Sequence, residues 1–230
     1  TLKIPAFERE TEYISLKSKE EYALYDGVIA STDAGTTPVV NYRNWTNEYL
    51  VPHSTAKYTK NVRDSYLVGA LARFNNNHEQ LSPRAKKAAA ELGLKAPCYN
   101  PFMNTVAQVV EAVHAVDESI RLIDEVLDKG LKEEDRRILL KAGRGVGAVD
   151  VPRGILFHDY TYDKNGVCCE ANCIIPTNQN HANIQKDMEA LLPQILGQPQ
   201  DEIRLKLEML VRAYDPCISC STHLLKVKFV

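Results

Sequence analysis

The sequence has little excess charge of either sign and no long apolar run. Its 28 lysines and arginines against 30 aspartates and glutamates give a net charge of −2. This balance excludes the basic surplus typical of proteins that bind nucleic acids or anionic membranes. No stretch without a charged side chain exceeds fifteen residues. Because a membrane-spanning helix needs about 18 or more apolar residues, we expect none.

The chain also lacks an initiating methionine and a secretory signal. It begins at Thr1, and the residues that follow contain no charged n-region, apolar h-region or cleavage site. Truncation is the simplest explanation, so we expect the 230 residues to be part of a longer protein. Hydrophobic residues at 44% and charged residues at 25% are typical of globular domains and exclude disorder.

Cysteine is scarce and unevenly distributed. Five of the six cysteines fall in the last 63 residues, and only Cys98 lies outside that region. A secreted domain held by disulfides would be shorter and richer in cysteine. We therefore expect free thiols in a reducing compartment, or thiolates bound to a metal.

The apolar pattern predicts a mainly α protein with small β-hairpins, an α+β fold. The dipeptide Asp26-Gly27 favours a hairpin near the start, and residues 163–166 favour a second one. The predicted strands are residues 12–16, 22–25, 28–30, 155–162 and 167–175. Residues 41–60 show neither the helical nor the strand period and predict a loop.

Helical periodicity dominates from residue 64 onward. Ser82 is a good N-cap before Pro83, and Gly130 is a good C-cap for the longest helix, which is long enough to be the spine of a helical bundle. The glycine run at 143–147 breaks the pattern, and it does not fit a dinucleotide loop because no strand precedes it. The predicted helices are residues 64–74, 83–92, 106–129, 133–141, 183–192 and 200–213.

The sharpest motif is Asp-Pro-Cys-x-x-Cys-x-x-His at residues 215–223. Two cysteines three positions apart on a turn can direct both sulfurs at one metal, and Pro216 ends the preceding helix just before them. Cys217 and Cys220 are therefore candidate ligands. The spacing alone leaves open a zinc site, two inert thiols or, least favoured, a redox pair. Ligands that could complete a zinc site are Cys169, Cys173 and His223.

Two further segments are unusual. Arg153 lies between Pro152 and Gly154 at the mouth of the second hairpin, although an isolated arginine is most often part of a surface salt bridge. Residues 173–181 are uncharged and rich in amides and hydroxyls. They either cap the next helix or line a polar pocket that excludes charge.

Together these segments resemble the large, catalytic subunit of the nickel–iron hydrogenases. That family ends in an Asp-Pro-Cys-x-x-Cys-x-x-His or Arg segment and carries a Pro-Arg-Gly arginine upstream, which corresponds to Arg153. The runs Val-Pro-His-Ser-Thr-Ala-Lys at 51–57 and Ile-Pro-Thr-Asn-Gln-Asn-His at 175–181 are similar to its cytoplasmic, multisubunit branch. The resemblance covers the whole chain, and four motifs in the family's order make it specific.

The resemblance implies a nickel–iron centre, the iron carrying cyanide and carbonyl ligands. Cys217 would be a terminal nickel ligand and Cys220 would bridge nickel and iron, since soft thiolates suit both metals. Arg153 would donate hydrogen bonds toward the cyanide ligands and assist dihydrogen cleavage, oriented by Asp215, with a fixed fork of donors that lysine lacks. Also implied are Pro152, which shapes the pocket, Thr177, which hydrogen-bonds a cyanide, and His223 and the Cys173 carbonyl, which bind magnesium or a second iron.

The implied activity is the reversible oxidation of dihydrogen to protons and electrons in the cytoplasm. The implied partners are an iron–sulfur small subunit, an electron-acceptor module of unspecified chemistry, maturation chaperones and a C-terminal endopeptidase. Two other functions stay open: a zinc-stabilised interaction domain and a related quinone-reducing respiratory subunit. Retention of both Cys217 and Cys220 argues against the respiratory subunit, and metal content would identify the zinc domain.

One departure from the family is clear, because a second CxxC expected near the N-terminus is missing and residues 1–160 contain only Cys98. We therefore expect the C-terminal portion of a large subunit, inactive alone and with its metals absent or incomplete. The resemblance assigns no role to Cys168, Cys169 or Cys98. The expected segments are 1–60 (hairpin and loop), 61–142 (helical), 143–178 (Pro-Arg-Gly and hairpin), 179–223 (helices and CxxC) and 224–230 (an extension that the endopeptidase removes).

Overall fold

The computed structural model describes residues 4–221, without the side chains of Cys220 and Ser221. Its strands are β1 (Glu12–Lys17), β2 (Val28–Ser31), β3 (Gly35–Thr37), β4 (Asn47–Tyr49), β5 (Tyr58–Lys60), β6 (Tyr66–Leu67), β7 (Gly143–Val151), β8 (Gly154–Tyr162) and β9 (Cys168–Ile174). Its α-helices are α1 (Ala70–Asn77), α2 (Pro83–Glu91), α3 (Asn104–Lys129), α4 (Pro176–Ile195), α5 (Gln200–Ala213) and α6 (Ile218–Ser221). Short 3₁₀ turns lie at Val39–Asn44, His78–Gln80 and Pro101–Met103.

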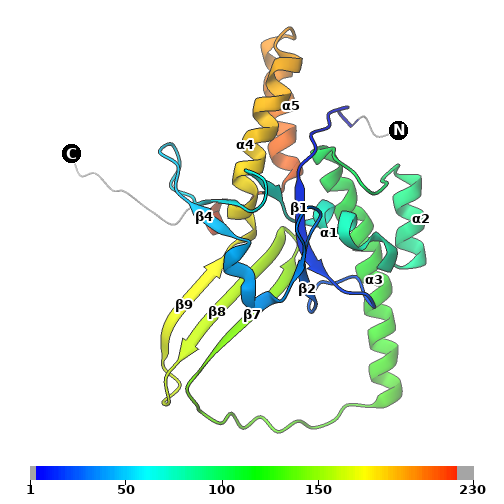
Figure 1. Cartoon of the computed structure of the whole chain (residues 1–230). Helices are drawn as coiled ribbons and strands as arrows, with labels where there is room; N and C mark the ends of the chain where they lie inside the picture. Colours follow the sequence, from blue (N-terminus) through cyan, green and yellow to red (C-terminus); the bar gives the residue numbers. More distant parts are fainter. Residues whose placement is uncertain (1–3, 222–230) are drawn as a thin grey trace, which may run out of the picture.

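This mixture confirms the predicted α+β fold with small sheets. The described strands form a sheet of order β3-β2-β1-β6, the pair β4-β5 and the sheet β7-β8-β9. Figure 1 shows the β7-β8-β9 sheet running out from the base of the α4–α5 pair, with α1, α2 and α3 grouped on the other side of β1. No helix between residues 4 and 221 is long and apolar enough to cross a membrane.

Local capping chemistry begins α2 and ends α3 where the sequence predicts. The Ser82 side chain accepts a hydrogen bond from the Ala85 N–H and begins α2 at Pro83. Gly130 follows α3 with a φ of 72°, a backbone conformation that glycine adopts without strain. These ends depend on contacts within one helical turn, which is why the sequence alone locates them.

Several local predictions are wrong. Residues 41–60, predicted as a loop, contain part of a 3₁₀ turn and the paired strands β4 and β5. The helix predicted at 64–74 begins only at Ala70, after the short strand β6. Residues 133–141 form no helix, since nine residues are too few to be helical without packing, and Leu139 and Leu140 are exposed. Residues 22–25 form no strand, and β2 pairs directly with β1 across the intervening loop. The glycine run at 143–147 opens a nine-residue strand, because β8 pairs with β7 along its whole length and overrides the low strand propensity of glycine.

Helix α3 is a core helix over only part of its length. Val106 and Val110 are buried, whereas the apolar stripe beyond them is exposed, with Val116, Ile120 and Leu127 each at least half exposed. Within the described chain, the helix predicted as a spine therefore packs against the core through its first three turns.

The polar run at 173–181 covers the end of β9 and the first turns of α4, which begins at Pro176 and buries its amides. The Gln179 side chain donates to the Ile155 carbonyl over 2.7 Å. The Asn180 side chain accepts from the Val68 N–H over 2.9 Å and donates to the Val68 carbonyl over 3.1 Å. These amides join α4 to β8 and to the chain entering α1, and so fix the backbone that leads away from the Pro152–Arg153 turn.

Candidate metal centre

The turn between β7 and β8 brings Arg153 to the end of α5. Pro152 and Arg153 form a two-residue turn, since Val151 pairs with Gly154. The Arg153 Nε donates to the Asp215 backbone carbonyl over 2.6 Å, and its Nη2 lies 3.4 Å from Asp215 Oδ1. The structure therefore brings together two predicted site residues that are 62 positions apart.

The Arg153–Asp215 ion pair can orient the guanidinium but contributes little to the stability of the fold. The Arg153 and Asp215 side chains are 39% and 43% exposed, and their closest charged atoms lie 3.3 Å apart. An ion pair as exposed as this contributes about 1 kcal/mol or less to folding. The guanidinium has five N–H donors, so it can hold Asp215 and still donate to a ligand beside it.

Asp215 itself has an unusual backbone conformation. Its φ of 49° makes it the non-glycine residue with positive φ in the described chain. The α5 helix ends at Ala213 as predicted, and the turn at Asp215 with Pro216 next to it prevents the helix from continuing. Such a conformation costs about 1–3 kcal/mol and is found preferentially at functional sites.

Thr177 holds the cysteine motif at its first cysteine. Its buried hydroxyl, on the first turn of α4, accepts a hydrogen bond from the Cys217 N–H over 3.2 Å. A hydroxyl can accept and donate at once, so Thr177 can fix Cys217 and still offer its own proton to a ligand. Cys217 is half-buried at the junction of α4, α5 and α6, and its sulfur lies 3.5 Å from the Ser219 hydroxyl.

Of the remaining predicted ligands, only Cys173 has a described side chain. Cys173 is exposed on β9, where its sulfur lies 3.4 Å from the Tyr160 hydroxyl and 3.5 Å from His158 Nδ1. The Cys220 side chain and all of His223 lie outside the described residues. Among residues 4–221, no group of three His, Cys, Asp or Glu side chains is placed to hold a metal.

The donor set therefore fits a soft-metal centre in part. Cys217 offers one thiolate beside the Arg153 donors and the Thr177 hydroxyl, which suits nickel or iron carrying small anionic ligands. Cys98, Cys168, Cys169 and Cys173 are free thiols. Burial raises the pKa of the Cys98 thiol, as expected for an inert thiol packed on the core.

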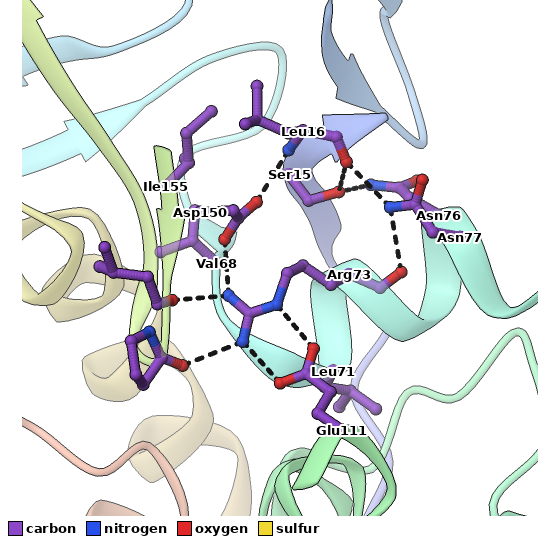
Figure 2. A network of polar contacts seen from close by, with 12 residues as sticks. Ser15, Leu16, Val68, Leu71, Arg73, Asn76, Asn77, Glu111, Asp150 and Ile155 are labelled. Atoms are coloured by element: carbon purple, nitrogen blue, oxygen red, sulfur yellow. Dashed lines mark hydrogen bonds and ion pairs between the residues drawn. The ribbon is translucent and has the colours of Figure 1, made fainter. Parts of the chain in front are cut away.

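A buried arginine that the sequence analysis missed lies behind the Arg153 turn. Figure 2 shows Arg73, from α1, reaching both Asp150 on β7 and Glu111 on α3. Its side chain is 1% exposed. Asp150 also accepts the Leu16 N–H over 2.8 Å, and burial raises the pKa of Asp150 to about 6 although Arg73 opposes the rise. The available signal was a charged residue on an otherwise apolar helix face.

A second buried network lies behind Asp215. The Tyr214 hydroxyl donates to Asp187 on α4 and accepts from the Asn183 side chain over 2.7 Å. Arg9 pairs with Asp187 over 2.5 Å. Burial raises the pKa of Asp187, which Arg9 and Tyr214 oppose, and burial raises the pKa of Tyr214 well above its usual value. Both residues of the exposed pair are therefore attached to polar networks within the core.

Comparisons with known proteins agree on one class. The family model described as nickel-dependent hydrogenase matches residues 12–223. The chain therefore belongs to the nickel-dependent hydrogenase family. The alpha subunit of sulfhydrogenase 1 from Pyrococcus furiosus is 32% identical over 208 residues, which are 90% of this chain and 48% of that subunit. The beta subunit of the NAD-reducing hydrogenase HoxS from Cupriavidus necator is 30% identical over 172 residues, 70% of this chain and 34% of that subunit.

The fold comparison gives the same result. An NAD⁺-reducing [NiFe]-hydrogenase in the H₂-reduced state matches with a TM-score of 0.76 and 25% identity, over 94% of this chain and 51% of that chain. The chain spans about half the length of the sulfhydrogenase subunit and of this hydrogenase chain, and about a third of the HoxS subunit. Its family is that of hydrogenase large subunits, as the motifs predicted, and the zinc-domain and respiratory alternatives are not favoured.

Proposed function

We propose that this chain is part of the catalytic subunit of a nickel–iron hydrogenase, which oxidises dihydrogen reversibly to protons and electrons. The observation that carries the proposal is the contact of Arg153 with Asp215 beside Cys217 and Thr177. The family match and the names of the relatives support the nickel-dependent class. The zinc-stabilised domain has no comparable support.

We assign the residues of the centre as follows. Cys217 and Cys220 would supply thiolates to nickel and iron, and His223 and the Cys173 carbonyl would bind magnesium or a second iron. When bound, the nickel–iron pair would supply the point at which dihydrogen is split and its electrons are taken up. Pro152 narrows the turn and presents Arg153 to that point.

The chain's own residues bind and orient. Asp215 holds the Arg153 guanidinium through its carbonyl and its carboxylate, so the remaining N–H groups can hydrogen-bond an anionic ligand and stabilise charge as it develops. Thr177 fixes the Cys217 backbone and can donate its proton to a second anionic ligand. A lysine at position 153 could not hold Asp215 and a ligand in one plane.

The names of two relatives support the inferred partners. We infer an iron–sulfur small subunit and an electron-acceptor module, since one relative is named an NAD-reducing hydrogenase subunit and another an F420-non-reducing hydrogenase iron–sulfur subunit, from Archaeoglobus profundus. Maturation chaperones, a cytoplasmic location, the five segments given above and removal of residues 224–230 by an endopeptidase are parts of the same proposal. A chain ending at His223 that acquired nickel as readily as the uncut chain would contradict a role for that extension in maturation.

The test is metal content and activity of the complex isolated from its natural source without oxygen. We expect nickel and iron in the complex and dihydrogen-dependent reduction of a viologen dye, both lost in Cys217→Ser. Cys169→Ser is the matched control, because Cys169 is an exposed thiol on β9, and it should keep both. Stoichiometric zinc without nickel would refute the proposal and favour the zinc-stabilised domain.

A further inference from the structure

We propose that Arg73 is a positioning residue that fixes the Pro152–Arg153 turn from inside the core and thereby sets the direction of the Arg153 guanidinium. The role of Arg153 in this inference rests on the proposed function. The contact between Arg73 and the turn does not, because it lies wholly within the described chain (Figure 2).

Arg73 binds the backbone that leads directly into Arg153. Its Nη1 donates to the Val151 carbonyl over 2.7 Å, and its Nη2 donates to the Pro152 carbonyl over 3.1 Å. These are the two carbonyls that immediately precede Arg153 in the chain. Because the contacts are to carbonyls, they orient the two peptide planes of the turn whatever side chain occupies position 153.

The remaining hydrogen bonds of Arg73 connect the turn carbonyls to two separate elements. Nη1 also bonds Asp150 Oδ1 over 2.6 Å, and Nε and Nη2 bond the two carboxylate oxygens of Glu111 over 2.6 and 2.7 Å. One rigid guanidinium therefore joins α1, α3 and β7 to the turn. Lysine has a single nitrogen, so it could not make these contacts together.

Close backbone packing holds the same turn from a second side. A Cβ on Gly69, which precedes α1, would lie 3.2 Å from the Arg153 carbonyl. The Arg73 backbone N–H donates to the Gly69 carbonyl over 2.9 Å. Arg73 and Gly69 therefore lie on the same helical turn. The start of α1 thus contacts the turn by backbone and by side chain together.

The arginine at position 73 has a role beyond filling the core. A buried ionic cluster is often no more stabilising than apolar residues of the same volume, so stability alone does not explain it. Arg153, by contrast, has a side chain that is 39% exposed and lies on a two-residue turn. The Arg73 contacts hold both peptide groups that lead into it.

The experiment compares Arg73→Lys with Glu111→Gln in the full chain. Glu111→Gln alters the Arg73 contact on α3 but keeps both turn carbonyls bound. Ile29→Ala, a substitution at a buried position in β2, is the control for a loss of stability that does not involve Arg73. The readouts are the rate at which phenylglyoxal modifies Arg153, mapped by mass spectrometry, and the NMR signal of the Arg153 Nε–H.

We expect Arg73→Lys to raise Arg153 reactivity about fivefold, the factor for one lost hydrogen bond of ordinary strength, and to shift the Nε–H signal. Glu111→Gln and Ile29→Ala should leave both unchanged. If Arg73→Lys does not fold, the neutral triple variant Arg73→Met, Glu111→Gln, Asp150→Asn replaces the whole cluster without leaving an unpaired buried charge. It should show the same rise.

A folded Arg73→Lys or triple variant whose Arg153 behaves as in Ile29→Ala would overturn the positioning role. Neither readout needs metal or dihydrogen, so that result would leave the proposed function standing. Full dihydrogen oxidation by an Arg153→Lys complex would instead refute the role proposed for Arg153 and leave the positioning contact intact.

Discussion

Replacement of Gly154 by alanine should destabilise the chain because this glycine lies where the Arg153 turn touches the start of α1. Gly154 has a φ of 135°, a region that residues with a side chain rarely adopt. A Cβ there would lie 2.3 Å from Val68 Cγ2, 2.7 Å from Val68 Cβ and 3.0 Å from the Gly69 nitrogen. The substitution therefore combines backbone strain with overpacking.

The magnitude follows from those two terms. A strained φ costs about 1–3 kcal/mol. Overpacking a filled core costs about 1–3 kcal/mol more. The free energy of unfolding should fall by about 2–6 kcal/mol, a large share of the roughly 5–15 kcal/mol that holds a typical domain folded.

The assay is urea unfolding followed by circular dichroism, with Gly147→Ala as the matched control. Gly147 lies on β7 in the same hairpin, and a Cβ there would meet nothing within 4 Å. Its substitution should change the unfolding free energy by about 0.5 kcal/mol or less. Adding Val68→Ala to Gly154→Ala should recover part of the loss, since it removes the nearest clashing atom. Equal stabilities of Gly154→Ala and Gly147→Ala would refute the reasoning.

Two further predictions concern a pH dependence and the cysteine motif. Arg144 beside Asp159 holds the pKa of that carboxyl below its usual range, so its contribution to stability is present above about pH 4 and is lost as the pH falls. The stability gap between the wild type and Asp159→Asn should therefore narrow below about pH 4 in urea unfolding, and a constant gap from pH 7 to pH 3 would count against this. Thr177→Val removes the acceptor for the Cys217 N–H and should cost about 1 kcal/mol and speed exchange of that amide, whereas Thr177→Ser should not; unchanged exchange in Thr177→Val would contradict the contact.

Some features followed from the sequence because their causes are local. The ends of α2 and α3 depend on Ser82 and Gly130, which act within one helical turn. The β8–β9 hairpin depends on the turn at 163–166, where Asp163 accepts hydrogen bonds from the Asn165 and Val167 N–H groups. The motif around Cys217 identified the family, because the motif is defined by the spacing of residues that are close together in the sequence.

Other features depended on segments far apart in the chain. The short helix predicted at 133–141 does not form, because nothing in the described chain covers its apolar side chains. The glycine run became β7 because β8 supplied its hydrogen-bond partners. The amides after Ile175 became the buried start of α4, because their partners lie on β8 and before α1.

The sequence by itself determined the helix ends, the second hairpin and the family motifs, since each depends on residues close together in the chain. Only the tertiary structure decided which charges are buried and what they hold. Arg73 meets the turn carbonyls from a position 78 and 79 residues earlier, and Arg153 meets Asp215 across 62 residues. A buried guanidinium has to find its acceptors wherever the fold brings them, and no local pattern carries that information.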